Sequence, residues 1–414
     1  MKRISEILMI GVFAVFITVS MAVTLSNRDE TYSYFENRLY ATVPEVTAES
    51  VAGGEFFSGL ESFLCDHAAG RQILLKAKTY TDARILRRPV VNDVVVTRDV
   101  LLPYNPYEKT DKMQIAQQAE SMAAQHGKLR EQIESYGGSY IYTAVPCQYV
   151  CYENSYPSYL NSRKEFTEAE ISTLTASMEK YGVSMIDMLP VFERTAEGAA
   201  DRSVTDGGSD NVNNRLSYSS AVDNHYSLEG AYVTYREIID RINDQTGYSL
   251  KYPAGDEIAF SEVPEPYLGS RQRKLMGVIP WDEHLKKAVF RSEIPFTRMD
   301  NGQAVEASVY SDAAFEDGKV TYSLYMGGDI PETVIDTNRP ELPSVLIYGD
   351  SFTNAVETLA YYSFDEMRSI DMRYYKEMSV SQYIDKYKPD IVICIRDYES
   401  LLASDGNGNL FSVQ

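Results

Sequence analysis

The chain has 414 residues, of which 44% are hydrophobic, and such a chain can bury a sizeable core in one large domain or two smaller ones. Lys and Arg number 39 against 60 Asp and Glu, which gives a net charge of −21, and the acidic residues are spread along the chain. This charge repels phosphate backbones, so we expect no nucleic-acid partner. It is typical of a soluble exported protein and carries no information about the fold.

Residues 1–27 predict a cytoplasmic tip followed by a membrane segment. Lys2 and Arg3 precede a charge-free apolar run at residues 7–25, and its length of about 19 residues is near that needed to cross a bilayer. The basic flank places the remainder on the extracytoplasmic face of the cell membrane. The Ser-Met-Ala sequence at residues 20–22 is a poor cleavage site, which favours an uncleaved anchor; a cleaved signal peptide and a secreted protein are the alternative.

The rest of the chain divides into two predicted parts. Residues 28–108 form an N-terminal extension, in which the sequence of residues 90–104 is typical of a hairpin or a pair of edge strands. Residues 109–414 form the expected main domain. Within it, Pro, Gly and short alternating runs such as KVTYSLYM (residues 319–326) indicate a mostly β insertion at about residues 250–340.

Apolar strands alternate with helices elsewhere in residues 109–414. The expected strands are residues 139–145, 183–189, 345–348, 370–375 and 391–395, and the expected helices are residues 109–136, 164–181, 228–245, the segment after Ser351, and 379–388. This alternation predicts an α/β fold with a doubly wound parallel sheet covered on both faces. A long polar connection at residues 193–227 interrupts the pattern, and functional loops are commonly of this kind.

One strand runs into the sequence Gly-Asp-Ser-Phe, with Ser351 at the predicted corner. A strand that turns through glycine into a helix lifts the residue at the turn to the carboxyl edge of the sheet, where open α/β folds bind ligands. The N–H groups at the start of the following helix are suited to stabilise a developing oxyanion. The alternative is that Ser351 only caps that helix, a role that serine fills well.

A serine nucleophile needs a base, and the chain has only four histidines. We expect His126, in a polar helix, and His284, in a charged loop, at the surface. His67 falls before the predicted sheet begins. His225 follows Asp223 by two residues, and in an extended turn this spacing points both side chains the same way, so the carboxylate can orient the imidazole.

We expect no metal and no other cofactor. Cys65, Cys147, Cys151 and Cys394 show no paired metal spacing, and the four histidines include no His-x3-His pair, which makes a metal-dependent deacetylase improbable. Four cysteines are too few for a disulfide scaffold in so long a chain, although one disulfide remains an option.

Several stretches resemble known families. GDSF (residues 349–352) resembles the first block of SGNH (GDSL-type) hydrolases, and DNHYSLEGAY (residues 223–232) is similar to the Asp-x-His segment of DHHW family proteins and of the related alginate O-acetylation proteins. Further similar stretches are ENRLYATVP (36–44), FLCDHAAGR (63–71) and MGGDIP (326–331). The resemblance spans most of residues 35–400, with Asp-x-His before Ser, the permuted order of the alginate group. The name-giving His-His-Trp is here Asn-His-Tyr at residues 224–226.

The resemblance implies an SGNH-like fold and a catalytic triad. In it, Ser351 is the nucleophile, His225 acts as general base and then acid, and Asp223 orients the histidine. The N–H of Ser351 is one expected oxyanion donor. Asn354, one helical turn on, and Gly328 are further candidates, for which helix-cap and turn roles are the alternatives.

These residues point to acyl transfer through a covalent acyl-enzyme. The resemblance implies an O-acetyltransferase that modifies a cell-envelope or secreted polysaccharide, with a membrane-bound O-acyltransferase as a partner. A carbohydrate esterase with the same triad is one alternative, and a non-catalytic polysaccharide-binding scaffold is another. The 32 tyrosines are suited either to stacking on sugars or to ordinary packing.

Overall fold

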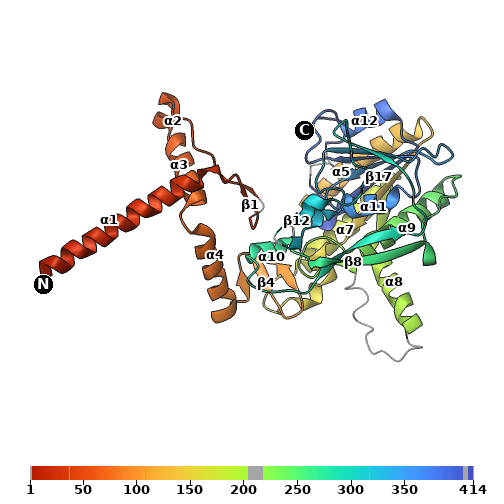
Figure 1. Cartoon of the computed structure of the whole chain (residues 1–414). Coiled ribbons are helices and arrows are strands. Elements are labelled where there is room, and N and C mark those ends of the chain that lie inside the picture. Colours follow the sequence, from red (N-terminus) through yellow and green to blue (C-terminus); the bar gives the residue numbers. More distant parts are fainter. Residues whose placement is uncertain are drawn as a thin grey trace. The chain divides into compact units, whose positions relative to one another are not determined.

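The computed structural model describes most of the chain (Figure 1). The described residues are 2–36, 38–107, 109–203, 218–316, 318–403 and 409–413. They form two compact units. The first contains residues 1–96 with 270–280, and the second contains residues 97–269 with 281–414.

The first unit is built on a long apolar helix, α1 (Lys2–Ser26). This helix is long and apolar enough to cross a membrane over Ile4–Ser26, and nearly all of its side chains are exposed, which fits the predicted anchor or signal sequence. The other elements are the strand pair β1 (Tyr32–Ser33) and β2 (Arg38–Leu39), the helices α2 (Ala48–Gly53), α3 (Glu55–His67), α4 (Arg71–Tyr80) and α10 (Ser270–Lys274), the π-helical turn η2 (Thr81–Ile85), and the antiparallel hairpin of β3 (Val90–Val91) and β4 (Val94–Val96).

The second unit contains an eight-stranded sheet. In order across the sheet, its strands are β11 (Gln303–Val305), β10 (Thr297–Asp300), β14 (Glu332–Asp336), β16 (Glu366–Asp371), β15 (Val345–Gly349), β17 (Ile391–Asp397), β6 (Ser139–Val145) and β7 (Ser184–Asp187). The five strands from β16 to β7 are parallel, whereas β14, β10 and β11 continue the sheet antiparallel. The prediction of an α/β fold with a large, mainly parallel sheet is therefore confirmed.

Two groups of helices cover this sheet. The helices of the second unit are α5 (Lys112–Glu134), α6 (Gln148–Cys151), α7 (Lys164–Lys180), α8 (Met188–Ser203), α9 (Leu228–Gln245), α11 (Thr353–Ala360) and α12 (Val380–Tyr387). α5 packs with α7 and α12, whereas α9 packs with α8 and α11, and both groups contact β6. The central strands are accordingly buried on both faces: every residue of β15 and β17 is buried, as a parallel sheet between two helical layers requires.

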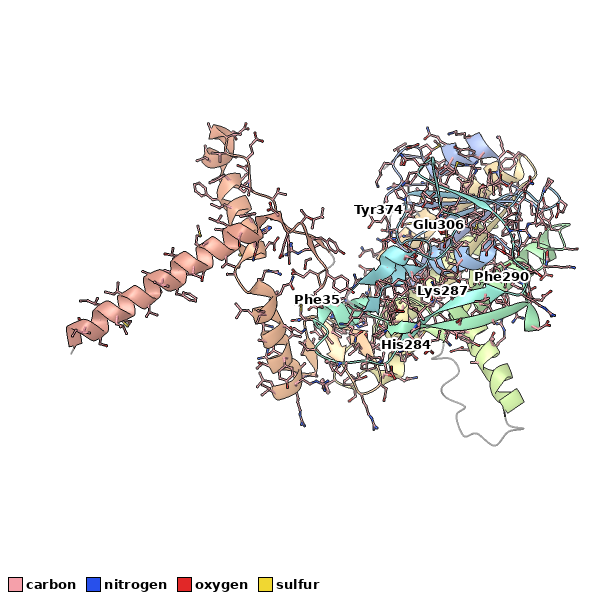
Figure 2. All side chains as sticks on the ribbon, in the orientation of Figure 1. Phe35, His284, Lys287, Phe290, Glu306 and Tyr374 are labelled. Carbon is pink, nitrogen blue, oxygen red and sulfur yellow. The ribbon has the colours of Figure 1, made fainter. Side chains whose placement is uncertain are left out.

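The region expected as a mostly β insertion contributes strands of two kinds. β10, β11 and β14 join the main sheet. The remaining strands form two antiparallel pairs, β8 (Ile258–Pro266) with β9 (His284–Phe290), and β12 (Phe315–Glu316) with β13 (Lys319–Val320). Figure 2 labels His284, Lys287 and Phe290 along β9. The alternating run at residues 319–326 is a strand only over its first two residues, and a 3₁₀ turn follows at Tyr322–Leu324.

Two expected elements differ from the observed ones. The strand predicted at residues 370–375 is β16, which ends at Asp371, because the Asp371 carboxylate accepts the Arg373 N–H (2.9 Å) and turns the chain there. The strand predicted at residues 183–189 ends at Asp187, whose carboxylate accepts the Leu189 N–H (3.1 Å) at the start of α8.

The long polar connection predicted at residues 193–227 is only partly described. Its first residues belong to α8, which extends to Ser203. Residues 204–217 lie outside the described residues. The chain is described again from Tyr218, just before the segment that carries Asp223 and His225.

Gly349 ends β15 at the point where this strand lies against β17. A Cβ atom at Gly349 would overlap the carbonyl oxygen of Ile395. Only glycine therefore permits the close pairing of the two strands immediately before the turn at Ser351.

We expect Gly349→Ala to lower the free energy of unfolding by about 3 kcal/mol or more, because backbone atoms must shift to admit the methyl group. Gly247→Ala is the matched control, since a Cβ there meets no atom within 4 Å. Urea denaturation of the two variants measures the difference. Equal stability of both would contradict the close approach of β15 and β17.

Candidate active site

The turn between β15 and α11 carries Ser351, and the side chain of Asp350 holds this turn in place. One carboxylate oxygen of Asp350 accepts the N–H of Phe352 (3.0 Å). The other accepts the N–H of Asp397 (3.3 Å) and the hydroxyl of Ser400 (2.9 Å) at the end of β17. Asp350 thus joins the serine turn to the neighbouring strand, and Ser351 lies at the carboxyl edge of the parallel strands.

A buried cation accompanies this carboxylate. Arg396 is 2% exposed, and its Nε lies 3.5 Å from an Asp350 oxygen. Burial, followed by the nearby Asp350 carboxylate, raises the pKa of Asp397. Asp350 and Arg396 thus form a buried pair of opposite charges directly behind the serine turn, and neither side chain is exposed to solvent.

His225 is presented by a short loop before α9. Two backbone hydrogen bonds close this loop, from the Ser220 N–H to the His225 carbonyl (3.1 Å) and from the Ser227 N–H to the Tyr218 carbonyl (3.0 Å). Ser227 also caps α9 through its hydroxyl, which accepts the Gly230 N–H. The loop and the helix start therefore fix the backbone on both sides of the histidine.

The three residues expected to form a triad are brought together. His225 Nε2 lies 2.8 Å from Ser351 Oγ, and His225 Nδ1 lies 3.0 Å from an oxygen of Asp223. With Nδ1–H donating to the carboxylate, Nε2 is the acceptor for the serine hydroxyl. Both distances lie within the range expected for a nucleophile, a base and an orienting carboxylate.

Aromatic rings enclose the histidine. The ring of His225 stacks on that of Tyr322 with centroids 3.7 Å apart and planes 7° apart, and Phe352 lies 5.1 Å away on centroids. Tyr226 stacks on Phe352 and donates its hydroxyl to the Phe352 carbonyl. These contacts fix the imidazole plane and exclude water from its sides.

Tyr267 supports the carboxylate of the triad. Its hydroxyl donates to the same oxygen of Asp223 that faces His225, and the other oxygen accepts the Asn224 N–H (2.9 Å). Burial, followed by the charge of Asp223, raises the pKa of Tyr267 far above its usual value, so this hydroxyl stays a neutral donor. Neither Tyr267 nor Tyr322 could be predicted as a site residue, because both lie far from the Asp-x-His segment along the chain.

A second carboxyl group braces the loop that carries Asp223. Glu283, at the start of β9, accepts the Ala221 N–H (2.9 Å). Burial raises the pKa of Glu283 to about 7, against the opposing effect of a hydrogen bond from Ser220. Glu283 thus contacts the backbone at Ala221, two residues before Asp223, through a carboxyl group that titrates near neutral pH.

The three candidate oxyanion donors differ in their surroundings. Within the described residues, the Ser351 N–H has no hydrogen-bond partner, and Nδ2 of Asn354 is buried without one. The Gly328 N–H instead donates to the Tyr325 carbonyl (3.1 Å) within a turn. The free donors in the described part of the serine turn are therefore on Ser351 and Asn354.

The other three histidines form hydrogen bonds with a tyrosine hydroxyl or with backbone carbonyls. His126, expected at the surface, is fully buried, and its Nδ1 lies 2.7 Å from the hydroxyl of Tyr140, because α5 turns this residue toward the sheet. His67 is also buried, with Nδ1 2.9 Å from the Phe63 carbonyl. His284 is half-buried, with Nδ1 2.9 Å from a backbone carbonyl of β8.

All four cysteines are free thiols. Cys147, Cys151 and Cys394 are buried, and Cys65 is exposed. Among the described residues, no three His, Cys, Asp or Glu side chains are grouped in a way that could hold a metal ion.

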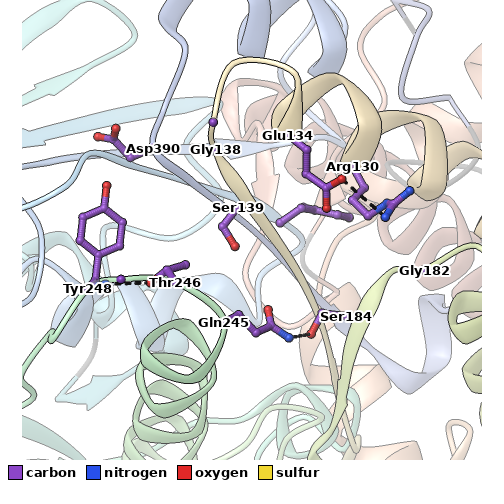
Figure 3. A pocket seen from close by; sticks show the side chains of 13 residues that line it. Arg130, Glu134, Gly138, Ser139, Gly182, Ser184, Gln245, Thr246, Tyr248 and Asp390 are labelled. Carbon is purple, nitrogen blue, oxygen red and sulfur yellow. Dashed lines mark hydrogen bonds and ion pairs between the residues drawn. The ribbon is translucent and has the colours of Figure 1, made fainter.

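Hollows open on two edges of the sheet. A polar hollow of about 630 Å³ lies at the amino ends of β6 and β7, where Ser139 and Ser184 line it together with Arg130 and Gln245 (Figure 3). Because Ser351 follows the carboxyl end of a parallel strand, this hollow belongs to the opposite edge.

Two smaller hollows lie on the same edge as the serine. One of about 340 Å³ is lined by Glu170 and Glu399, and one of about 210 Å³ is lined by Tyr149, Leu189 and Tyr398. Burial raises the pKa of Glu170 to about 8, so this carboxyl group is protonated at neutral pH. The segments after β6, β7 and β17 therefore provide concave surface on the edge that carries Ser351, polar in the hollow beside Glu170 and mixed in the hollow beside Tyr149.

Comparison with known proteins places this fold among solved structures. No protein-family model matches the sequence, and no curated protein matches it. PatB1 of Bacillus cereus with a sulfonyl adduct has a TM-score of 0.59 at 19% identity, covering 75% of this chain and 97% of that one. A second PatB1 structure has a TM-score of 0.58 at 19% identity, with 78% and 99% covered.

A DHHW family protein from Eubacterium siraeum also has this fold. Its TM-score is 0.54 at 15% identity, covering 78% of this chain and 97% of that one. The relationship to DHHW proteins expected from the sequence is thus found in the fold. At this identity the likeness concerns the fold, and the site is described by its own geometry.

The raised pKa of Glu283 predicts a pH-dependent stability. This carboxyl group has an ordinary pKa of 4.5 and a folded pKa of about 7, so its contribution to stability is full below pH 4.5 and is lost as pH rises through 7. At each pH we take the free energy of unfolding of Glu283→Gln minus that of the unsubstituted protein. We expect this difference to increase by about 1–3 kcal/mol from about pH 5 to about pH 8, because only the unsubstituted protein must bury a charged carboxylate at the higher pH. Urea denaturation at both pH values measures this change.

Glu61→Gln, at an exposed carboxylate of α3, is the control for that measurement. Its difference from the unsubstituted protein should be small and the same at both pH values. A Glu283→Gln difference that does not change with pH would contradict the assigned burial of this group.

Proposed function

We propose that the chain is an extracytoplasmic O-acyltransferase, transferring acetyl groups to a cell-envelope or secreted polysaccharide through a Ser-His-Asp acyl-enzyme mechanism in an SGNH-like site. The observation that carries this proposal is the continuous hydrogen-bonded path from Ser351 through His225 to Asp223, with separations of 2.8 and 3.0 Å. A serine that only capped a helix would not require a histidine oriented toward it by a buried carboxylate.

In the first half of the reaction, Ser351 Oγ attacks the carbonyl carbon of an acyl ester while His225 Nε2 takes the hydroxyl proton. The imidazolium is stabilised by Asp223, and the negative oxygen of the tetrahedral intermediate is held by the Ser351 N–H and Asn354 Nδ2. Collapse breaks the bond to the leaving oxygen, which receives the proton from His225 and leaves an acyl-serine.

In the second half, an acceptor hydroxyl attacks the acyl-serine and His225 removes its proton. A sugar hydroxyl as acceptor gives O-acetylation, whereas water gives an esterase, the second candidate function, because the same geometry serves both. The polar hollow on the serine edge, beside Glu170 and Glu399, offers hydrogen-bonding groups to a sugar acceptor.

Two further observations support the proposal. PatB1, which shares the fold, carries a sulfonyl adduct, and a sulfonyl compound forms such an adduct with an activated nucleophile of a protein. The apolar helix α1 is suited to hold the unit outside the membrane. In this proposal a membrane-bound O-acyltransferase partner delivers the acyl group, as the sequence resemblance implies.

The nucleophile is tested with the full chain and p-nitrophenyl acetate. We expect an acetyl adduct on the peptide containing Ser351, detected by mass spectrometry, and a loss of ester cleavage of about 10³-fold or more in Ser351→Ala. Ser172→Ala, at an exposed serine of α7, is the matched control and should keep both the adduct and the activity. An unmodified Ser351 in the folded, unsubstituted protein would favour the non-catalytic scaffold.

The acceptor is tested in the same system. Transfer of acetyl from the acyl-serine to an added oligosaccharide, faster than its release to water, supports the acyltransferase. Release to water alone, with no effect of the oligosaccharide, assigns the site to an esterase.

The oxyanion donor is tested by Asn354→Ala. We expect kcat for p-nitrophenyl acetate to fall by about 10²–10³-fold, because the variant lacks one N–H donor for the tetrahedral intermediate. The unfolding midpoint should fall modestly, since the buried side chain loses the hydrogen bond that Oδ1 accepts from the Thr353 hydroxyl (3.5 Å), whereas Nδ2 has no partner within the described residues to lose. An unchanged kcat would remove Asn354 from the oxyanion site.

A further inference from the structure

A basic segment stands out in the otherwise acidic first unit and comprises residues 71–88, that is α4, η2 and the three residues that follow. Its cationic residues are Arg71, Lys76, Lys78, Arg84, Arg87 and Arg88, and its acidic residue is Asp82. Six positive charges against one negative charge give +5, and one of the six, Arg71, is paired with Glu36 outside the segment (2.7 Å), whereas the whole chain carries −21. The rest of the chain therefore carries −26, and this segment is a local reversal of sign.

The basic segment also exposes large apolar side chains. Ile73 is 74% exposed, Leu74 69%, Ile85 64%, Leu86 54% and Tyr80 51%. Single exposed apolar residues are ordinary, but five within 14 residues of one segment mark an interaction surface.

The apolar and basic residues of α4 are arranged about one stripe. At about 100° per residue, the side chains of one side of the helix are Ile73, Leu74, Ala77 and Tyr80, and Lys76 and Lys78 lie at the two borders of this stripe. Thr79, on the other side, is buried against the unit. Lysines beside an apolar stripe can lay their stems along it and keep their ammonium groups in a polar layer.

The start of α4 is held at the outer end of α1. The Ala69 N–H donates to the Thr24 hydroxyl (3.1 Å), and Asn27 Nδ2 donates to the His67 carbonyl (3.5 Å). His67 Nε2 also lies 3.1 Å from the Glu30 carbonyl. α4 begins two residues after Ala69, and Figure 1 shows α1, α3 and α4 meeting at this junction. With α1 across a bilayer, the first turn of α4 is therefore at the level of the lipid headgroups.

We propose that residues 71–88 bind the outer surface of the same bilayer, with the apolar stripe at the boundary of headgroups and acyl chains and the cationic groups on anionic phospholipids. An anionic lipid surface fits this segment, because such a surface repels a chain of net charge −21 but attracts a segment of opposite sign. The junction with α1 supplies the second condition, proximity to the membrane. Neither condition depends on the proposed acyl transfer.

The proposal is tested with the full chain in lipid nanodiscs, with Cys65→Ser removing the exposed thiol. Leu74→Cys carries an environment-sensitive fluorophore, and lipids with a spin label in the acyl chain act as quenchers. We expect quenching of about twofold or more at this position in nanodiscs of phosphatidylcholine with phosphatidylglycerol.

Glu49→Cys is the matched control, because Glu49 is an exposed residue of α2 in the same unit. α2 carries no basic residue and lies outside the basic segment, so a label there should be quenched less than a label at Leu74→Cys. Equal quenching at both positions, or none at Leu74→Cys, would overturn the proposal. A shift of the fluorescence without quenching by lipid would also overturn it, since protein would then cover the stripe.

The charge contribution is tested by omitting phosphatidylglycerol and, separately, by Lys76→Glu. Each basic group near an anionic surface changes partitioning by about fivefold, so both changes should reduce the quenching at Leu74→Cys. Quenching that is indifferent to lipid charge and to Lys76→Glu would contradict the assignment to anionic phospholipid.

Discussion

The carboxylate of Asp350 is the group on which the candidate site depends. It joins the turn that carries Ser351 to the end of the neighbouring strand through Asp397 and Ser400, and it is itself balanced by the buried Arg396. A buried carboxylate is costly unless its lone pairs are occupied and a positive charge is near, and here both conditions are met. Removal of any one partner would leave a desolvated charge directly behind the serine, so the turn has little freedom to move.

The site is assembled from segments far apart along the chain, and its rigidity comes from more than the triad. His225 and Ser351 are 126 residues apart, yet His225 is held by a stacked ring on one side and a carboxylate on the other. Tyr267 and Glu283 come from the region between them and brace Asp223 and its loop. The residues that follow β8 and precede β9 are thereby part of the support of the site, although no residue of either strand belongs to the triad.

The two units divide the physical tasks of the protein. The second unit buries the charged and polar side chains of the candidate site, such as Asp223, Asp350 and Arg396, at the edge of a sheet that is covered on both faces. Hydrogen bonds and charge interactions are stronger there because water is excluded. The first unit does the reverse, exposing apolar side chains and concentrating positive charge in residues 71–88 beside the apolar helix α1. A net charge of −21 would otherwise oppose approach to an anionic membrane surface.

The apolar helix α1, most strands and helices of the α/β fold, and the corner at Ser351 could be predicted from the amino-acid sequence, because they follow from local periodicity and turn residues. The sequence also singled out Asp223 and His225 through their spacing. The folded structure was needed to show that His225 reaches Ser351, that His126 is buried, and that Tyr322 stacks on His225. These contacts depend on how the helices pack on the sheet and on how distant segments meet, and the local sequence pattern does not specify either.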